Sequence, residues 1–135
     1  MFTKKQISYL PAIGWFFLLL YFICIPPSSI PPVETWINKF YPDKWVHAIL
    51  FGVLVFLFIY PLKKTNHPKK QKKNTALKIL LAAFIWGITT ECIQKYFIPG
   101  RFFDWYDWLA DSFGAFCGYV YGKKLITKSL HPKSE

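Results

Sequence analysis

Long apolar runs alternate with short polar stretches along the chain, and this alternation predicts four membrane-spanning helices. The runs lie at about residues 8–25, 45–62, 76–98 and 105–122. At a rise of ~1.5 Å per residue, a helix of about 18 residues reaches roughly 27 Å, close to the thickness of the hydrocarbon core. Residues 33–41 instead place apolar side chains three and four positions apart, which predicts a short interfacial amphipathic helix. The predicted fold class is therefore all-α, a polytopic membrane protein.

The connections between these runs are rich in proline, glycine and lysine. The stretch PPSSIPP at 26–32 and the Pro99-Gly100 pair cannot continue a helix, so they separate the predicted spans. The first run carries no charge and lacks a small-residue cleavage site, so we expect an uncleaved helix rather than a signal peptide. The expected organisation is a single transmembrane domain over 1–135, with a lysine-rich cytoplasmic loop at 63–75 and a basic cytoplasmic tail at 123–135.

The basic residues are concentrated on one side of the predicted membrane. The formal net charge is +10, from 17 lysine and arginine residues against seven acids. Most lysines flank the N-terminus, the connection at 63–78 and the C-terminus, whereas most acids lie on or near the other two connections. By the positive-inside rule, both termini are expected to be cytoplasmic, with the acids facing outward. The lysines do not interleave with the aromatic residues, so the charge indicates a topology signal beside the lipid bilayer and no nucleic-acid surface.

The three cysteines, Cys24, Cys92 and Cys117, all fall inside apolar runs. Their number is odd and no C-x-x-C pair is present, so neither disulfides nor a cysteine zinc site is expected. We interpret them as small buried hydrophobic residues.

Polar residues gather at the helix ends that are predicted to lie on the outer side. They are Asp43, Lys44 and His47 at the start of the second run, Glu91 and Gln94 near the end of the third, Arg101 in the following turn, and Asp104, Asp107 and Asp111 at the start of the fourth. Charges in such apolar surroundings are costly unless they are paired. A membrane chain that keeps this many in one place is therefore expected to use them.

Spacing suggests roles for some of these residues. Asp43 and His47 are four residues apart and share a helix face, so the carboxylate is predicted to fix the tautomer of the imidazole. Alternatively, Asp43 forms the N-cap of the second helix, which it suits equally well. The alternative for His47 is a hydrogen bond inside the bundle. Glu91 lies about two turns before the Pro99 break, at a membrane depth where a carboxylate indicates a functional site. The alternative for Glu91 is a structural ion pair with Arg101 or His47.

Three acids, Asp104, Asp107 and Asp111, are spaced three and four apart and so lie on one face of the fourth helix. Their position near a helix N-terminus suits the helix dipole, and Asp104 could also be a cap. Like charges repel, so a positive group is expected opposite them. The candidates are Arg101, Lys44, Lys95, a protonated His47 and a bound metal ion.

Three glycines continue the acidic face of the fourth helix. Gly114, Gly118 and Gly122 follow at intervals of four residues. This row predicts close packing against a neighbouring helix, which would draw the acidic face toward that helix.

Together these motifs resemble the VanZ-like family of small bacterial integral membrane proteins. The shared pattern is Asp43-Lys44-x-x-His47, Glu91-x-x-Gln94, Pro99-Gly100-Arg101 and Asp107-x-x-x-Asp111-x-x-Gly114-x-x-x-Gly118. Asp111 stands where family members often carry asparagine, which adds a charge. The resemblance implies a multi-pass protein of the bacterial plasma membrane, a place in the cell envelope and a link with the response to glycopeptide antibiotics.

Three functions fit this outward-facing acidic, histidine and arginine site. In the first, it binds or modifies a lipid-linked envelope component, and Arg101, Lys44 and Lys95 hold the anionic headgroup. Aromatic side chains near the site would pack on lipid or sugar. The remaining ligand-binding candidates are Asp43, Gln94, Asp104 and Asp111.

In the second hypothesis the chain is an intramembrane hydrolase or transferase acting on a phospholipid or polyprenyl phosphate. His47 would be the general base and Glu91 the acid, with Asp107 as a further catalytic candidate. A divalent metal ion is the alternative cofactor, and its candidate ligands are Glu91, Asp107, Asp111 and His47.

The third hypothesis is a structural or partner-binding role, in which the polar residues only hold the helix ends together. Transport would require a homo-oligomer, because four short helices do not enclose a pore alone.

Overall fold

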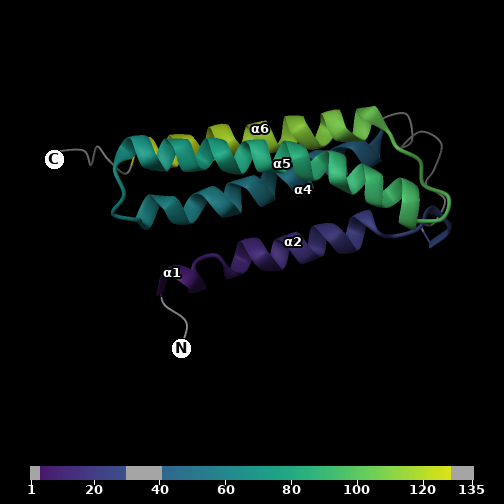
Figure 1. Cartoon of the computed structure of the whole chain (residues 1–135), viewed down its shortest axis with the longest axis horizontal. Coiled ribbons are helices and arrows are strands. Elements are labelled where there is room, and N and C mark those ends of the chain that lie inside the picture. The colour runs from purple at the N-terminus through teal and green to yellow at the C-terminus, as the bar shows by residue number, and fades with distance from the viewer. Residues whose placement is uncertain (1–3, 30–40, 129–135) are drawn as a thin grey trace.

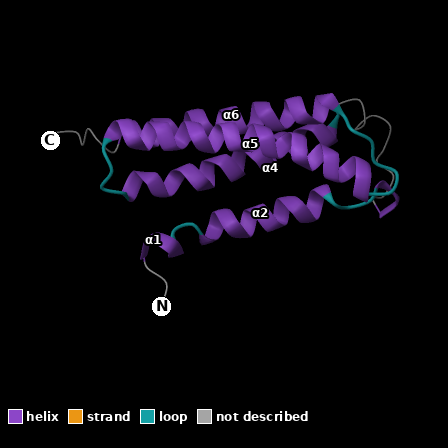
Figure 2. Ribbon diagram, viewed as in Figure 1, coloured by secondary structure: helices purple, strands orange, loops and turns teal. Residues whose placement is uncertain are grey.

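A computed structural model describes residues 4–29 and 41–128, and over these residues the chain is all-helical, as predicted. Figures 1 and 2 show helices joined by short loops, with no strand among the described residues. The elements are α1 (Lys4–Ile7), α2 (Leu10–Ile23), the 3-10 turn η1 (Pro27–Ser29), α4 (Pro42–Ile59), η2 (Tyr60–Lys64), α5 (Lys69–Phe97) and α6 (Trp105–Lys128). The interfacial helix predicted at 33–41 lies almost wholly outside the described residues.

Helices α4, α5 and α6 pack together along their lengths, and α2 lies beside them (Figure 1). The buried apolar core runs between these helices and includes Leu19, Phe51, Val55, Ile59 and Leu80. Helix α2 is held by Trp15, whose indole Nε1 donates to Leu50 O of α4 at 2.9 Å. Helix α1 and the C-terminal end of α6 lie at one end of the bundle, and the starts of α4 and α6 at the other.

The closest helix contact is between α4 and α6, along the predicted glycine row. A Cβ atom added to Gly114 would lie 1.9 Å from Ala48 O, and one added to Gly118 would lie 2.1 Å from Gly52 O. Only glycine lets the two backbones approach this closely. At Gly122 the nearest atom would be Ile59 Cγ2 at 2.7 Å. The predicted packing role of the row is therefore confirmed.

The helix ends differ from the predictions where polar residues continue a helix. Helix α4 begins at Pro42 instead of residue 45, because proline suits the first helical position. Asp43 therefore lies inside the first turn, and the prediction that it forms the N-cap is wrong: Tyr41, in the left-handed region at φ 48°, occupies that position. Helix α6 continues to Lys128, well beyond residue 122.

The lysine-rich segment at 63–75 is only partly a loop. Helix α5 begins at Lys69, because lysine is a good helix former and a solvated helix can extend beyond the membrane. Lys72 in its first turn is buried, and its Nζ donates to Lys63 O at 3.3 Å. The ammonium thus ties the first turn of α5 to the end of η2.

Two described helices are long and apolar enough to cross a membrane, at Pro42–Lys64 and Lys69–Phe97. Helix α2 is apolar but has only 14 residues, instead of the 18 predicted at 8–25. Helix α6 has 24 residues, and the acids at its start and the lysines near its end make it less apolar.

The cysteines are not all buried as interpreted from the sequence. Cys24 and Cys92 are partly buried, whereas Cys117 is exposed on α6. A free cysteine behaves as a small hydrophobic residue, and single apolar side chains are common on protein surfaces.

Candidate functional site

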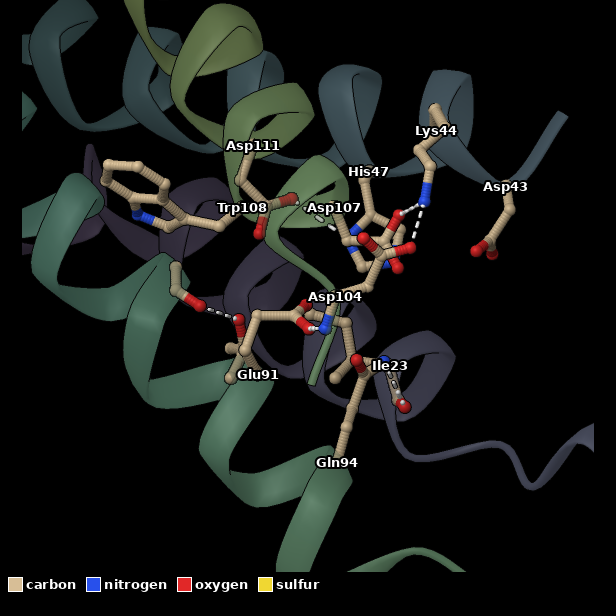
Figure 3. Close-up of polar contacts among 12 residues, drawn as sticks. Ile23, Asp43, Lys44, His47, Glu91, Gln94, Asp104, Asp107, Trp108 and Asp111 are labelled. Carbon is tan, nitrogen blue, oxygen red and sulfur yellow. Dashed lines mark hydrogen bonds and ion pairs between the residues drawn. The ribbon is translucent and has the colours of Figure 1, made fainter. Parts of the chain in front are cut away.

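The predicted polar residues meet where α4 and α6 begin and α5 ends (Figure 3). Each helix contributes at least one buried polar side chain, and Figure 3 shows His47, Glu91 and Asp111 converging from α4, α5 and α6. Residues far apart in the sequence are thus brought together at one end of the bundle. We call this group the polar cluster; its members are Asp43, Lys44, His47, Glu91, Asp104, Asp107 and Asp111.

Lys44 is the cation that faces the acids at the start of α6. Its Nζ donates to Asp104 Oδ2 at 2.6 Å and also to Asp107 Oδ1. The hydrogen bond from Lys44 holds the pKa of the Asp104 carboxyl below its ordinary value. Asp104 Oδ1 also accepts the backbone N–H of Tyr106 at 2.8 Å, which is the contact of a helix cap. The predicted cap role of Asp104 is confirmed, and Lys44 is one of the predicted opposing charges.

His47 pairs with Asp111 of α6. The distance from His47 Nδ1 to Asp111 Oδ1 is 2.9 Å, and both side chains are buried. The alternative predicted for His47, a hydrogen bond inside the bundle, is therefore the contact observed. Asp43 is half exposed, and its Oδ2 lies 4.0 Å from Arg101 Nη1. A buried carboxylate is the stronger partner, because no water competes for it.

Glu91 is fully buried but only partly satisfied. Its Oε2 accepts the backbone N–H of Asp104 at 2.9 Å, which ties the loop before α6 to α5. Within the described parts of the chain, Glu91 Oε1 and Asp111 Oδ2 are buried without a hydrogen-bond partner. The predicted ion pair of Glu91 with Arg101 or His47 is not among its contacts. Buried polar atoms are normally paired, so these two oxygens point to a ligand or a shared proton.

Three further predicted residues lie around the polar cluster and make most of their contacts outside it. Gln94 is buried and donates through Nε2 to Ile23 O at 3.2 Å, linking α5 to α2. Arg101 Nη2 donates to Ile25 O at 3.5 Å, and among the residues with described positions its buried Nε has no partner. Lys95 is exposed, with its Nζ 5.1 Å from the centre of the Tyr96 ring. Lys95 therefore does not balance the acids.

Two groups of side chains have the spacing of metal ligands. His47, Glu91 and Asp111, all buried, each offer one ligand atom, and these atoms lie within 4.8 Å of one another. Asp43, His47 and Asp107 form a second group under the same limit. The metal ligands predicted from the sequence, Glu91, Asp107, Asp111 and His47, therefore fall into two groups, and His47 belongs to both.

A hollow of about 910 Å³ lies beside the polar cluster, lined by Tyr41, Lys44, Trp45, Asp104 and Tyr106. The sequence placed Tyr41 at the end of the predicted interfacial helix and not at the site, and it did not indicate Tyr106. The available signal was their position, since each neighbours a predicted helix start and tyrosine favours the membrane interface. Trp108 is instead turned to α5, where its Nε1 donates to Phe84 O at 3.2 Å.

A family model described as VanZ/LLP1 matches residues 12–126, which include the whole polar cluster and most of the chain. No curated protein and no solved structure gives a significant match. The chain belongs to the VanZ/LLP1 family, which confirms the resemblance inferred from its motifs. With its two long apolar helices, it is a VanZ-like membrane protein.

Proposed function

We propose that this VanZ-like protein is a four-span protein of the bacterial plasma membrane and binds or modifies the phosphorylated headgroup of a lipid-linked envelope component. Both termini would be cytoplasmic and the polar cluster would face outward. The lysine-rich segments support this orientation, because η2, the start of α5 and the end of α6 lie at the bundle end opposite the polar cluster. Helix α2 would reach the membrane surfaces together with its flanking residues.

The observation that carries the proposal is the incomplete pairing of Arg101. Its guanidinium has five donors, and its polar contacts within residues 4–29 and 41–128 are at 3.5 Å to Ile25 O and 4.0 Å to Asp43 Oδ2. Lys44 by contrast already donates to two carboxylates. Of the two cations described at the site, Arg101 is therefore the one whose described contacts leave capacity for an anion. A planar guanidinium suits the two-oxygen edge of a phosphate.

Two spaces support a lipid in particular. The hollow of about 910 Å³ beside Lys44 has room for a headgroup and carries tyrosine and tryptophan at its wall. An entirely apolar cavity of about 390 Å³ lies between α2, α4 and α5, lined by residues that include Phe16, Phe58 and Trp86. A lipid that used both spaces would keep its charged end at the membrane surface and its chain among apolar side chains.

A second candidate function is chemical turnover of that lipid. The His47–Asp111 hydrogen bond orients an imidazole beside Glu91, which is a usable arrangement for proton transfer. Hydrolysis or transfer at a lipid phosphate would then use groups that headgroup binding alone does not need.

Native mass spectrometry of the protein, extracted gently from its own membrane, tests the proposal. Wild type is expected to retain a phosphorylated lipid, and Arg101→Ala to lose at least about nine tenths of it, because a charge-assisted bidentate contact is worth about 1.5–3 kcal/mol. Lys95→Ala is the matched control, since it removes an exposed positive charge that lies over Tyr96. Equal lipid retention by the Arg101 and Lys95 variants would refute headgroup binding at this site. Product lipids of altered mass would favour the enzyme.

A further inference from the structure

The charge of the polar cluster conflicts with an anionic ligand unless a cation is added. Its carboxylates are Asp43, Glu91, Asp104, Asp107 and Asp111, and the cations near them are Lys44 and Arg101. With His47 neutral, the negative charges of these described residues exceed the positive charges by three. A phosphate entering this site would be repelled by the carboxylates at short range. The proposed function therefore calls for a further positive charge close to the buried acids.

We propose that His47, Glu91 and Asp111 bind one divalent cation, which provides this charge. Their exposures are 4%, 0% and 1%, and one potential ligand atom of each lies within 4.8 Å of the others. Glu91 Oε1 and Asp111 Oδ2 are the buried carboxylate oxygens without a partner in the described structure. A cation bound among the three side chains would give these buried carboxylates a positive partner. The inference deepens the proposed function and rests on it for its role toward phosphate.

The contacts around the three residues suit metal ligation. With its proton on Nε2, His47 presents the Nδ1 lone pair toward Asp111 Oδ1, and their 2.9 Å separation suits two ligands of one ion. Glu91 Oε2 is fixed by the Asp104 backbone, which leaves Oε1 as the free ligand oxygen. Each side chain comes from a different helix, so the geometry is set by the packing of α4, α5 and α6 (Figure 3).

The donor set indicates the class of ion. One imidazole and two carboxylates favour Mn²⁺ or Zn²⁺ over Ca²⁺, which prefers more oxygen ligands. Three protein ligands leave coordination positions for water or a phosphate oxygen. A phosphate could then contact the ion on one side and Arg101 on the other.

The second group of possible ligands fits less well. Asp107 is already bonded to Lys44, and Asp43 is half exposed and near Arg101. A cation there would compete with both basic side chains.

The alternative to a metal ion among His47, Glu91 and Asp111 is a proton shared between Glu91 and Asp111. Such a proton would give their free oxygens a hydrogen bond without a metal ion.

Titration of the chelator-stripped, detergent-purified protein with Mn²⁺, followed by electron paramagnetic resonance, tests the site without any lipid. Wild type is expected to bind one Mn²⁺ per chain, and Zn²⁺ to displace it. Glu91→Gln and Asp111→Asn should each weaken binding by at least about tenfold, and Asp43→Asn by less than about threefold. These amide substitutions keep side-chain size, and circular dichroism with size-exclusion chromatography selects the folded variants.

Absence of stoichiometric Mn²⁺ and Zn²⁺ binding by folded wild type would overturn the inference and favour the shared proton. Loss of binding in Asp43→Asn with retention in Glu91→Gln would also overturn it, by assigning the ion to the second group. Arg101→Ala separates the two proposals, because it should abolish lipid retention and leave Mn²⁺ binding in place. Lipid retention without metal binding would refute the proposed metal site and leave the proposed headgroup binding standing. Metal binding without Arg101-dependent lipid retention would refute headgroup binding and leave the metal site standing.

Discussion

The substitution Gly114→Ala should open the contact between α4 and α6. It should also disturb the polar cluster, which lies nearer the starts of these two helices. The added Cβ would lie 1.9 Å from Ala48 O, 2.6 Å from Ala48 C and 2.7 Å from Ala48 Cα. All three are backbone atoms, so no side-chain rotation relieves the overlap. To reach an ordinary contact of 3.4 Å, the two helices must separate locally by about 1.5 Å.

That separation has a second cost in the polar cluster. His47 precedes Ala48 on α4, and Asp111 lies one turn before Gly114 on α6, so their 2.9 Å hydrogen bond depends on the same contact. Overpacking costs about 1–3 kcal/mol, and a buried polar group left without its partner costs about 1–3 kcal/mol more. We expect Gly114→Ala to lower the free energy of unfolding by about 3 kcal/mol.

The assay is thermal unfolding in detergent, measured by the loss of the monodisperse peak in size-exclusion chromatography. Gly14→Ala is the matched control, because Gly14 is also helical and a Cβ there meets nothing within 4 Å. The control should be neutral or stabilise by up to ~1 kcal/mol, since alanine is the better helix former. Gly122→Ala should be milder than Gly114→Ala, because it meets the side chain of Ile59. If Gly114→Ala unfolds at the same temperature as Gly14→Ala, the close backbone contact and the reasoning built on it are wrong.

Two further predictions concern pH and topology. Lys44 lowers the pKa of Asp104 in the folded state, so this carboxylate stabilises the fold above its unfolded pKa of ~3.9, and the contribution is lost as pH falls through the lower folded value. The variant Asp104→Asn retains a capping side chain but loses the charge. It should unfold at a lower temperature than wild type at pH 6, and this difference should shrink as the pH falls to 3. A difference that does not change with pH would contradict the stabilising role of the Lys44–Asp104 ion pair. In a cysteine-free background, an impermeant maleimide added to intact spheroplasts should label Phe102→Cys and not Lys70→Cys, because the first is proposed to be outside and the second cytoplasmic. The reverse pattern would invert the proposed topology.

The sequence predicted the helices well wherever apolar residues continue, because burial in lipid or protein demands helical backbone there. It predicted their ends less well. Lys69 starts α5 far ahead of the apolar run, and Lys128 ends α6 well after it. Lysine favours a helix in water about as much as leucine does, so a hydrophobic pattern marks the membrane-embedded part of a helix and not its full length.

The gathering of the polar cluster was also predictable, and its pairing was not. The positive-inside rule put the starts of two helices and the end of a third on one side, which is where Lys44, Glu91 and Asp107 meet. Which acid pairs with which base depends on the register between helices. Spacing along one helix favoured Asp43 as the partner of His47, yet Asp43 turns toward Arg101.

The glycine row explains why Asp111 is the partner instead. Gly114 lies against the backbone of Ala48, and Gly118 against that of Gly52, so the contact advances by four residues on both helices. This fixes α6 against α4 in one register. His47 is the residue next to Ala48, and Asp111 is one helical turn from Gly114 on the same face as the glycines. The glycines therefore determine that Asp111 is the acid that contacts His47. Once α4 is known to be the partner helix, the GxxxG spacing predicts this pair. By this reasoning Gly114 belongs to the function of the site as much as to its packing, since any residue that holds α6 away from α4 also holds Asp111 away from His47.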